Sequence, residues 1–142
     1  MRKPTIAIIR EQPQSQTCQS VCPLHARFEI VVIHQLTGLP HAVAACRPQA
    51  VIIDTSAPSA WNGLDLADAI RQMSPALPIL LIPDRLSEEL LLRCIHIGVN
   101  EVMTPPCDCD AIAARLSHVL ARCSPAMPLA PAEADSMAAM IG

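Results

Sequence analysis

Five short apolar runs recur along the chain, and each is followed by polar residues. Most of them are continuously apolar rather than alternating, which is typical of strands covered on both faces. They are also shorter than most helices. The runs cover residues 5–9, 28–33, 50–53, 78–82 and 101–103. The pattern therefore predicts five buried strands in one parallel sheet.

Two helices are predicted from apolar side chains at helical spacing. One covers Gly63–Met73, and the other follows the fifth apolar run, where Asp108 or Asp110 provides an N-cap. The residues on the expected inner faces are Leu66, Ala67, Ile70 and Met73 in the first helix, and Ile112, Leu116, Val119 and Leu120 in the second. Both stripes indicate helices that pack one side against the sheet.

A third helix is predicted over Glu88–Ile97, because Ser87 is a suitable N-cap and Gly98 a suitable C-terminal stop. This helix contains three consecutive leucines, residues 90–92. A helix that packs one side on a sheet buries part of such a run, so we expect two of the leucines to be buried and one to face solvent.

Two further helices, over residues 14–25 and Leu39–Cys46, are expected from the alternation alone. The first is interrupted by Pro23, and the second is short. Alternating strands and helices with short connections predict a parallel sheet with right-handed crossovers and helices on both faces. Ligands of such folds lie at the carboxyl ends of the strands, so the residues that follow the apolar runs are the candidates for function.

Composition narrows the classes of protein that the sequence fits. The net charge of −3 gives no general attraction to nucleic-acid phosphate, so direct nucleic-acid contact by this segment is disfavoured. No apolar run reaches the ~20 residues that a membrane span needs, and the start lacks a signal peptide. We therefore expect a cytoplasmic protein without membrane contact. Four glycines form no nucleotide-binding loop and the five histidines no catalytic spacing, so no enzyme is indicated.

Seven cysteines in a reducing compartment do not indicate a disulfide framework. Two close pairs suggest a metal site. Structural zinc sites normally combine two such pairs, with two to four residues between the cysteines of each pair. Here one pair has a single residue between its cysteines, and the two pairs are remote from each other in the sequence. The close pairs are Cys18 with Cys22 and Cys107 with Cys109, while Cys46 and Cys94 stand alone in apolar surroundings. We interpret the pairs as incidental, and the two single cysteines as small hydrophobic side chains.

The residues after the apolar runs are unusual in their chemistry. After the first, third, fourth and fifth runs stand Arg10 and Glu11, then Asp54, then Pro83 and Asp84, and then Thr104, Pro105 and Pro106. Because the carboxyl ends of parallel strands meet at one edge of a sheet, we expect these residues to surround one pocket.

At this point the chain resembles the receiver domains of response regulators. Residues 48–54 with Pro58, Gly63 and Leu64 resemble the family's third strand and following loop. Residues 78–82 and 94–101, with Pro106, resemble its fourth and fifth strands and the helix between them. The resemblance covers about residues 5–122. It implies a receiver-like domain over residues 1–122 with a flavodoxin-like (βα)5 fold, a three-layer sandwich around a five-stranded parallel sheet, that relays a signal.

The resemblance places Asp54 at the family's phosphoacceptor position. The family holds Mg²⁺ with two acidic residues after the first strand, where this chain has Arg10 and Glu11, so Glu11 and Asp54 are the candidate Mg²⁺ ligands. The family also uses a Ser or Thr after the fourth strand and a Lys after the fifth, where Pro83 and Pro105 stand here. Two unit charges ~4 Å apart interact by roughly 1–4 kcal/mol, so Arg10 opposes a cation at this place. We therefore expect an atypical receiver, or pseudo-receiver, with a degenerate phosphorylation site.

Several alternatives remain open. In a conventional receiver, a histidine kinase phosphorylates Asp54. In a small-molecule sensor, Arg10 and Arg85 contact the phosphate of a nucleotide second messenger. In a pseudo-receiver, Arg10 pairs with Asp54 and imitates the charge of the metal. In a purely structural interpretation, Asp54 only ends a strand and caps the next loop. We favour the pseudo-receiver, which signals through dimerisation or contact with a partner.

Two further expectations follow from the resemblance. Receivers usually pair through their fourth helix, fifth strand and fifth helix, which implies a homodimer through that face. Residues 123–142 contain three prolines without periodicity, as a linker to a downstream domain would. Residues 137–142 resemble the passage into the ATPase domain of sigma-54-dependent activators, which implies the N-terminal regulatory domain of a transcription activator.

Overall fold

The computed structural model describes residues 3–11, 24, 26–35, 37–56, 62–104 and 108–123. Its five strands are β1 (Thr5–Ile9), β2 (Glu29–Ile33), β3 (Ala50–Asp54), β4 (Ile79–Ile82) and β5 (Glu101–Val102). Each coincides with one of the apolar runs, and no strand end differs from the expected one by more than one residue. The predicted strands are therefore confirmed.

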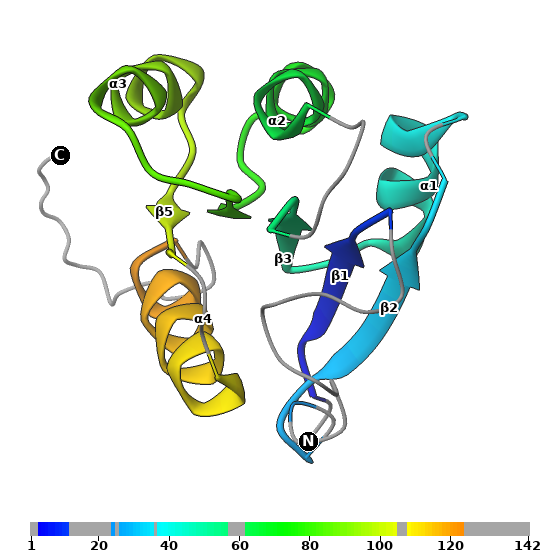
Figure 1. The fold of residues 1–142 in the computed structure, drawn as a ribbon. Coiled ribbons are helices and arrows are strands. Elements are labelled where there is room, and N and C mark those ends of the chain that lie inside the picture. Colours follow the sequence, from blue (N-terminus) through cyan, green and yellow to red (C-terminus); the bar gives the residue numbers. More distant parts are fainter. Residues whose placement is uncertain are drawn as a thin grey trace, which may run out of the picture.

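All five strands form one parallel sheet in the order β2-β1-β3-β4-β5 (Figure 1). The chain moves outward to β2 on one side of β1 and then to β3, β4 and β5 on the other. The strand order therefore switches between β1 and β3, which is where open α/β sheets place their sites.

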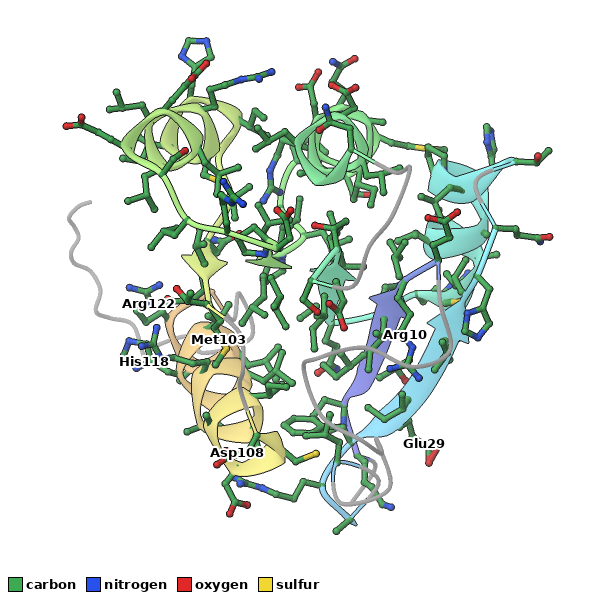
Figure 2. The ribbon with its side chains drawn as sticks, in the orientation of Figure 1. Arg10, Glu29, Met103, Asp108, His118 and Arg122 are labelled. Atoms are coloured by element: carbon green, nitrogen blue, oxygen red, sulfur yellow. The ribbon has the colours of Figure 1, made fainter. Side chains whose placement is uncertain are left out.

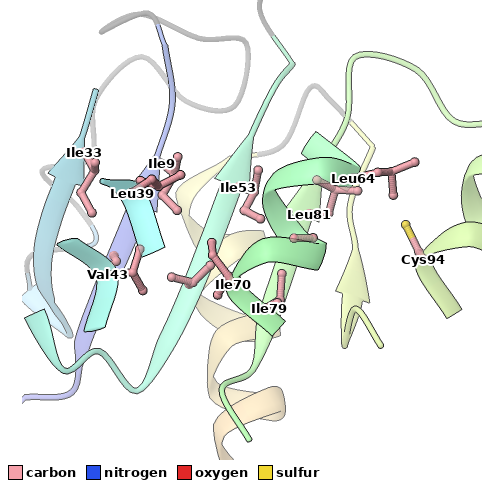
Figure 3. Packing of buried hydrophobic residues seen from close by; sticks show 13 residues of the cluster. Ile9, Ile33, Leu39, Val43, Ile53, Leu64, Ile70, Ile79, Leu81 and Cys94 are labelled. Carbon is pink, nitrogen blue, oxygen red and sulfur yellow. The ribbon is translucent and has the colours of Figure 1, made fainter. Parts of the chain in front are cut away.

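Helices cover the sheet on both faces, as expected for a three-layer sandwich (Figure 1). The helices α1 (Leu39–Cys46), α2 (Gly63–Met73) and α3 (Glu88–Ile97) lie on one face, and α4 (Cys109–Cys123) lies on the other. Side chains from α1, α2 and α3 meet one set of strand residues in the cluster of Figure 3. The alternate strand residues pack against α4, Leu24 and Phe28. The predicted helix over residues 14–25 lies outside the described residues except for Leu24.

Local sequence signals set the helix ends. The side chain of Ser87 accepts a hydrogen bond from the Leu90 N–H at 3.0 Å, and Gly98 ends α3 with φ 97°, as predicted. Asp108 caps α4 by accepting from the Ala111 N–H at 2.7 Å, which decides between the two expected caps. Asn62, which the sequence did not single out, caps α2 by accepting from Leu64 and Asp65.

The inner face of α2 differs from the prediction at one position. Ala67 and Ile70 are buried as expected, and Leu66 packs partly against the core. Met73 is 41% exposed, and Leu64 is buried instead. The buried residues of α2 therefore begin in its first turn and end at Ile70, and Met73 in the last turn is not among them. The predicted stripe of α4 is confirmed, since Ile112, Leu116 and Val119 are buried and Leu120 packs against them.

The prediction for the three leucines of α3 is wrong. Leu90 is half-buried, but Leu91 and Leu92 are both exposed. The helix α3 covers the edge of the sheet, where β5 has only two residues, and it packs laterally against α2. A narrow contact of this kind buries only one stripe of the helix, with Cys94 as its one fully buried side chain.

Arg71 joins the ends of four elements on the side of the sheet away from the carboxyl edge. Its guanidinium donates to the carbonyls of Ser74, Pro75 and Gly98 at 3.1, 2.8 and 2.9 Å, and to the Asn100 side chain at 3.0 Å. Asn100 Oδ1 also accepts from the Ile79 N–H. The end of α2, the end of α3 and the starts of β4 and β5 are therefore held by one side chain.

Cys46 and Cys94 pack as small hydrophobic side chains, as predicted. Burial raises the pKa of the Cys94 thiol, because it disfavours the thiolate. Cys109 packs against the α4 side of the core, while Cys18, Cys22 and Cys107 lie outside the described residues. In the part of the chain that the structure describes, no helix is long and apolar enough to cross a membrane.

Candidate functional site

The register of the sheet determines which residues meet at its carboxyl edge. Ile9 of β1 lies opposite both Ile33 of β2 and Ile53 of β3, and Asp54 lies opposite Ile82 of β4. Leu81 lies opposite Val102. One residue further along each strand, a row therefore crosses the sheet. From β2 to β5 it consists of His34, Arg10, Asp54, Ile82 and Met103.

This row faces the α4 side of the sheet. Side chains alternate between the faces of a strand, and Ile8, Ile52 and Ile82 belong to the core on that side. Arg10 and Asp54 follow at the same alternation. In Figure 2 the side chain of Arg10 lies beside β1 and β2, and Met103 lies between β5 and α4. The arginine and the aspartate thus occupy neighbouring positions on one face.

Asp54 is a buried carboxylate that holds the turn after β3. It is 4% exposed. Its Oδ1 accepts from the Ser56 N–H at 3.0 Å and from the Ser56 hydroxyl at 2.6 Å. This Asp-x-Ser geometry is a side-chain turn, and it satisfies one carboxylate oxygen within the loop. The structural role that the sequence left open for Asp54, which was to end the strand and cap the loop, is therefore present.

Arg10 is anchored by its backbone, and its side chain contains a buried hydrogen-bond donor. Its N–H donates to the Ile33 carbonyl at 3.1 Å, and its carbonyl contacts His34 Nδ1 at 3.2 Å. Its Nε is buried and has no hydrogen-bond partner among the described residues. A buried donor without an acceptor costs about 1–3 kcal/mol, so an acceptor group near Arg10 would be stabilising.

The described residues include the ion pairs of Glu101 with Arg115 at 2.7 Å and with Arg122 at 3.8 Å. The Ser56 contacts direct Oδ1 of Asp54 into its own loop. The pairing of Arg10 with Asp54, one of the alternatives from the sequence, stays a hypothesis.

The other predicted site residues lie around this row. Pro83 follows Ile82 and is buried, and Asp84 and Arg85 after it are exposed. Glu11 follows Arg10 and is partly buried. Pro105 lies outside the described residues. The structure therefore brings Arg10, Asp54 and Pro83 to adjacent strand ends, at the point where the strand order switches.

The donor set does not suit Mg²⁺ well. The described residues contain no group of three His, Cys, Asp or Glu side chains that could hold a metal ion. Mg²⁺ prefers octahedral oxygen ligation, and the position beside Asp54 presents a guanidinium instead of a carboxylate. Glu11 and Asp54 are the two carboxylates that remain.

Sequence reasoning missed two residues of the edge. Ser56 was detectable from the Asp-x-Ser spacing, which favours a side-chain turn. His34 was detectable as the first residue after the second apolar run. Neither residue belongs to the pattern that carries the resemblance to receivers.

Comparisons with known proteins agree with this fold. No family model matches the chain. A probable transcriptional regulatory protein, TcrX of Mycobacterium tuberculosis, is 23% identical over 118 residues, which are 83% of this chain and 50% of that protein. The chain thus spans about half the length of this curated relative.

Two solved structures show the same architecture. The chemotaxis protein CheY4 of Vibrio cholerae superposes with a TM-score of 0.67 at 14% identity, over 82% of this chain and 98% of that one. NtrX of Brucella abortus, solved in complex with ATP, superposes with a TM-score of 0.69 at 18% identity, over 84% of this chain and 27% of that one. The class that the fold defines is therefore the receiver fold of response regulators, and the expected flavodoxin-like (βα)5 class is confirmed.

Proposed function

We propose that this chain is the signal-receiving domain of a bacterial response regulator, with transcription as the regulated process, and that its phosphorylation site is degenerate. The receiver fold and the likeness to a probable transcriptional regulator support the general role. The observation that carries the finer proposal is Arg10, which stands beside the phosphoacceptor position where receivers place a metal-binding carboxylate.

Three features of the carboxyl edge support a pseudo-receiver. Arg10 opposes a cation near Asp54. The carboxylate of Asp54 is 4% exposed and accepts two hydrogen bonds from Ser56, which lowers its availability as a nucleophile. Pro83 has neither a hydroxyl group nor an N–H with which to contact a phosphoryl group. The domain would then transmit its signal through contacts with other proteins rather than by phosphorylation of Asp54.

The downstream contacts of such a domain are part of the same proposal. α4 ends at Cys123, one residue beyond the expected end of the receiver unit. We propose that residues 123–142 connect it to an output domain of the kind found in sigma-54-dependent activators. We also propose that the domain acts as a homodimer through the side that carries α3, β5 and α4, which are the fourth helix, fifth strand and fifth helix of a complete receiver.

Isothermal titration calorimetry with Mg²⁺ tests the metal part of this proposal. We expect no binding up to millimolar Mg²⁺ in the native chain and measurable binding in Arg10→Asp, because the substitution replaces a repulsive charge by a ligand. Arg47→Asp, an identical change of charge at the exposed C-cap of α1, is the matched control and should not bind Mg²⁺. Millimolar or tighter Mg²⁺ binding by the native chain would instead favour the conventional receiver with Glu11 and Asp54 as ligands.

A second candidate function rests on the buried Nε of Arg10, which has no hydrogen-bond partner in the described part of the chain. An anionic ligand such as a nucleotide second messenger would satisfy this donor. Arg85, which is exposed in the connection between β4 and α3, would be a second contact. A ligand at ~100 times its dissociation constant stabilises a protein by about 2.7 kcal/mol. Thermal unfolding that is unchanged across a panel of mono- and dinucleotides would exclude this alternative.

A further inference from the structure

Asparagine occurs at two positions in this chain, and one of them stands in a chemically labile pair. Asn62 is followed by Gly63, whereas Asn100 is followed by a glutamate. The side-chain amide of an asparagine can react with the backbone nitrogen of the next residue, and glycine hinders this attack least because it has no Cβ. Asn62 is exposed, while the amide oxygen of Asn100 accepts from Arg71 and from the Ile79 N–H. We therefore expect the two asparagines to differ strongly in reactivity.

The packing at the start of α2 requires the glycine of this pair. A Cβ on Gly63 would lie 2.9 Å from Leu81 Cδ1 and 3.3 Å from Thr55 Oγ1. Leu81 is fully buried in the core, and the Thr55 N–H donates to the Ile82 carbonyl at 2.9 Å, so neither neighbour has room to move away. A larger residue would separate the helix from the sheet. The fold therefore keeps the least hindered neighbour beside Asn62.

The cap of α2 holds the amide of Asn62 in an unreactive geometry. Its Oδ1 accepts from the N–H groups of Leu64 and Asp65 at 2.9 and 3.2 Å, and its backbone has a ψ of 111°. At this ψ the nitrogen of Gly63 points away from the Asn62 side chain, whereas the reaction needs the two side by side. Asn62 must therefore leave the cap before it reacts. An exposed helix end opens locally more readily than the core unfolds, so this step is accessible in the folded chain.

We propose that Asn62 is a site of spontaneous deamidation, which proceeds through local openings of the first turn of α2. The nitrogen of Gly63 forms a bond to Asn62 Cγ and releases its proton to water. The Cγ–Nδ2 bond breaks, and Nδ2 keeps the electron pair, takes up a proton and leaves as ammonia. Water then opens the cyclic imide. Cleavage between Cγ and the Gly63 nitrogen gives aspartate, and cleavage between the backbone carbonyl carbon and that nitrogen gives isoaspartate.

The two products affect α2 differently. Aspartate keeps an oxygen at the cap and adds a negative charge at the start of the helix, where the helix dipole favours it. Isoaspartate leads the main chain through the side-chain carbons, which lengthens the connection between Asp54 and α2 and takes the capping oxygen away from Leu64 and Asp65. Gly63 is then displaced relative to Thr55, the residue after Asp54. The isoaspartate form therefore changes the carboxyl edge of the sheet beside the candidate site.

Incubation of the full chain in heavy-oxygen water, followed by peptide mapping with mass spectrometry, tests the reaction. We expect labelled aspartate and isoaspartate at position 62 and an unchanged Asn100. In urea the reaction at Asn62 should be on the order of tenfold faster, because the unfolded chain has no cap to open. Asn62→Ser is the matched control, since it keeps a capping oxygen but has no amide, and its peptide should take up no label. A native chain that stays unmodified at Asn62 while the urea-treated chain reacts, or that reacts equally at Asn100, would overturn the proposal.

Amide hydrogen exchange tests the effect on α2. In the isoaspartate form, separated from the native chain by chromatography, the N–H groups of Leu64 and Asp65 should exchange on the order of tenfold faster. Asn62→Asp keeps the cap and should exchange them as slowly as the native chain does. Equal protection in the isoaspartate form and the native chain would contradict the loss of the cap. Neither measurement involves Mg²⁺ or phosphorylation, so failure here and failure of the proposed degenerate site are distinguishable.

Discussion

The triple variant Arg10→Asp, Pro83→Thr and Pro105→Lys is expected to take up a phosphoryl group from acetyl phosphate in the presence of Mg²⁺, unlike the native chain. The first substitution removes a cation beside Asp54 and adds a metal ligand. The second supplies a hydroxyl and an N–H after β4, and the third supplies the charge that the receiver pattern has before Pro106. Charge-assisted hydrogen bonds to a phosphoryl group contribute about 1.5–3 kcal/mol each, so two of them favour phosphorylation by more than tenfold.

Intact-mass spectrometry measures this gain, and the design contains its own control. The same triple variant with Asp54→Asn must lose the adduct, because the acceptor carboxylate is then absent. The single variant Pro83→Thr is expected to remain unmodified, since the repulsion by Arg10 persists. Absence of an adduct on a folded triple variant would show that burial of Asp54 in its turn with Ser56, rather than the three substituted positions, blocks the site.

Arg71→Met is expected to lower the free energy of unfolding by about 3 kcal/mol. The guanidinium donates four hydrogen bonds, two to the segment after α2 and two to the segment between α3 and β5. Hydrogen bonds to charged groups contribute about 1.5–3 kcal/mol each when their partners are otherwise unsatisfied. Part of this is recovered because Ser74 and Pro75 lie near the surface and can bind water. Methionine keeps the length and the apolar stem of the side chain, so the substitution isolates the loss of the donors.

Equilibrium urea unfolding followed by circular dichroism measures the effect. Gln72→Met is the matched control on the adjacent residue of α2, where the amide makes one exposed bond to Asp68 at 3.1 Å. It should change the stability by less than about 0.5 kcal/mol. Equal effects of the two substitutions would contradict the role of Arg71 in joining α2, α3, β4 and β5.

The fold was predictable because local and global signals agree. Continuous apolar runs located the strands, and the cap residues Ser87, Gly98 and Asp108 located the helix ends. The faces of the helices were less predictable, because a helix at the edge of a sheet buries less than its sequence permits. Leu92 is apolar in a central position of α3 and still 62% exposed, since β5 beneath it is only two residues long.

The site was predictable in position but not in contacts. Arg10, Asp54 and Pro83 lie at adjacent strand ends, as the rule for parallel sheets and the resemblance to receivers indicated. The contacts of Asp54 with the N–H and hydroxyl of Ser56 were not predicted, because the positions of strand ends do not show which loop donors lie within hydrogen-bond distance of a carboxylate.

The most direct test of the degenerate site is exposure of the native chain to acetyl phosphate and Mg²⁺, read by intact mass beside Asp54→Asn and a working receiver as control. We predict no phosphoryl adduct on the native chain under conditions that modify the control receiver. A phosphoryl adduct that is present in the native chain and absent in Asp54→Asn would contradict the account and establish Asp54 as a conventional phosphoacceptor.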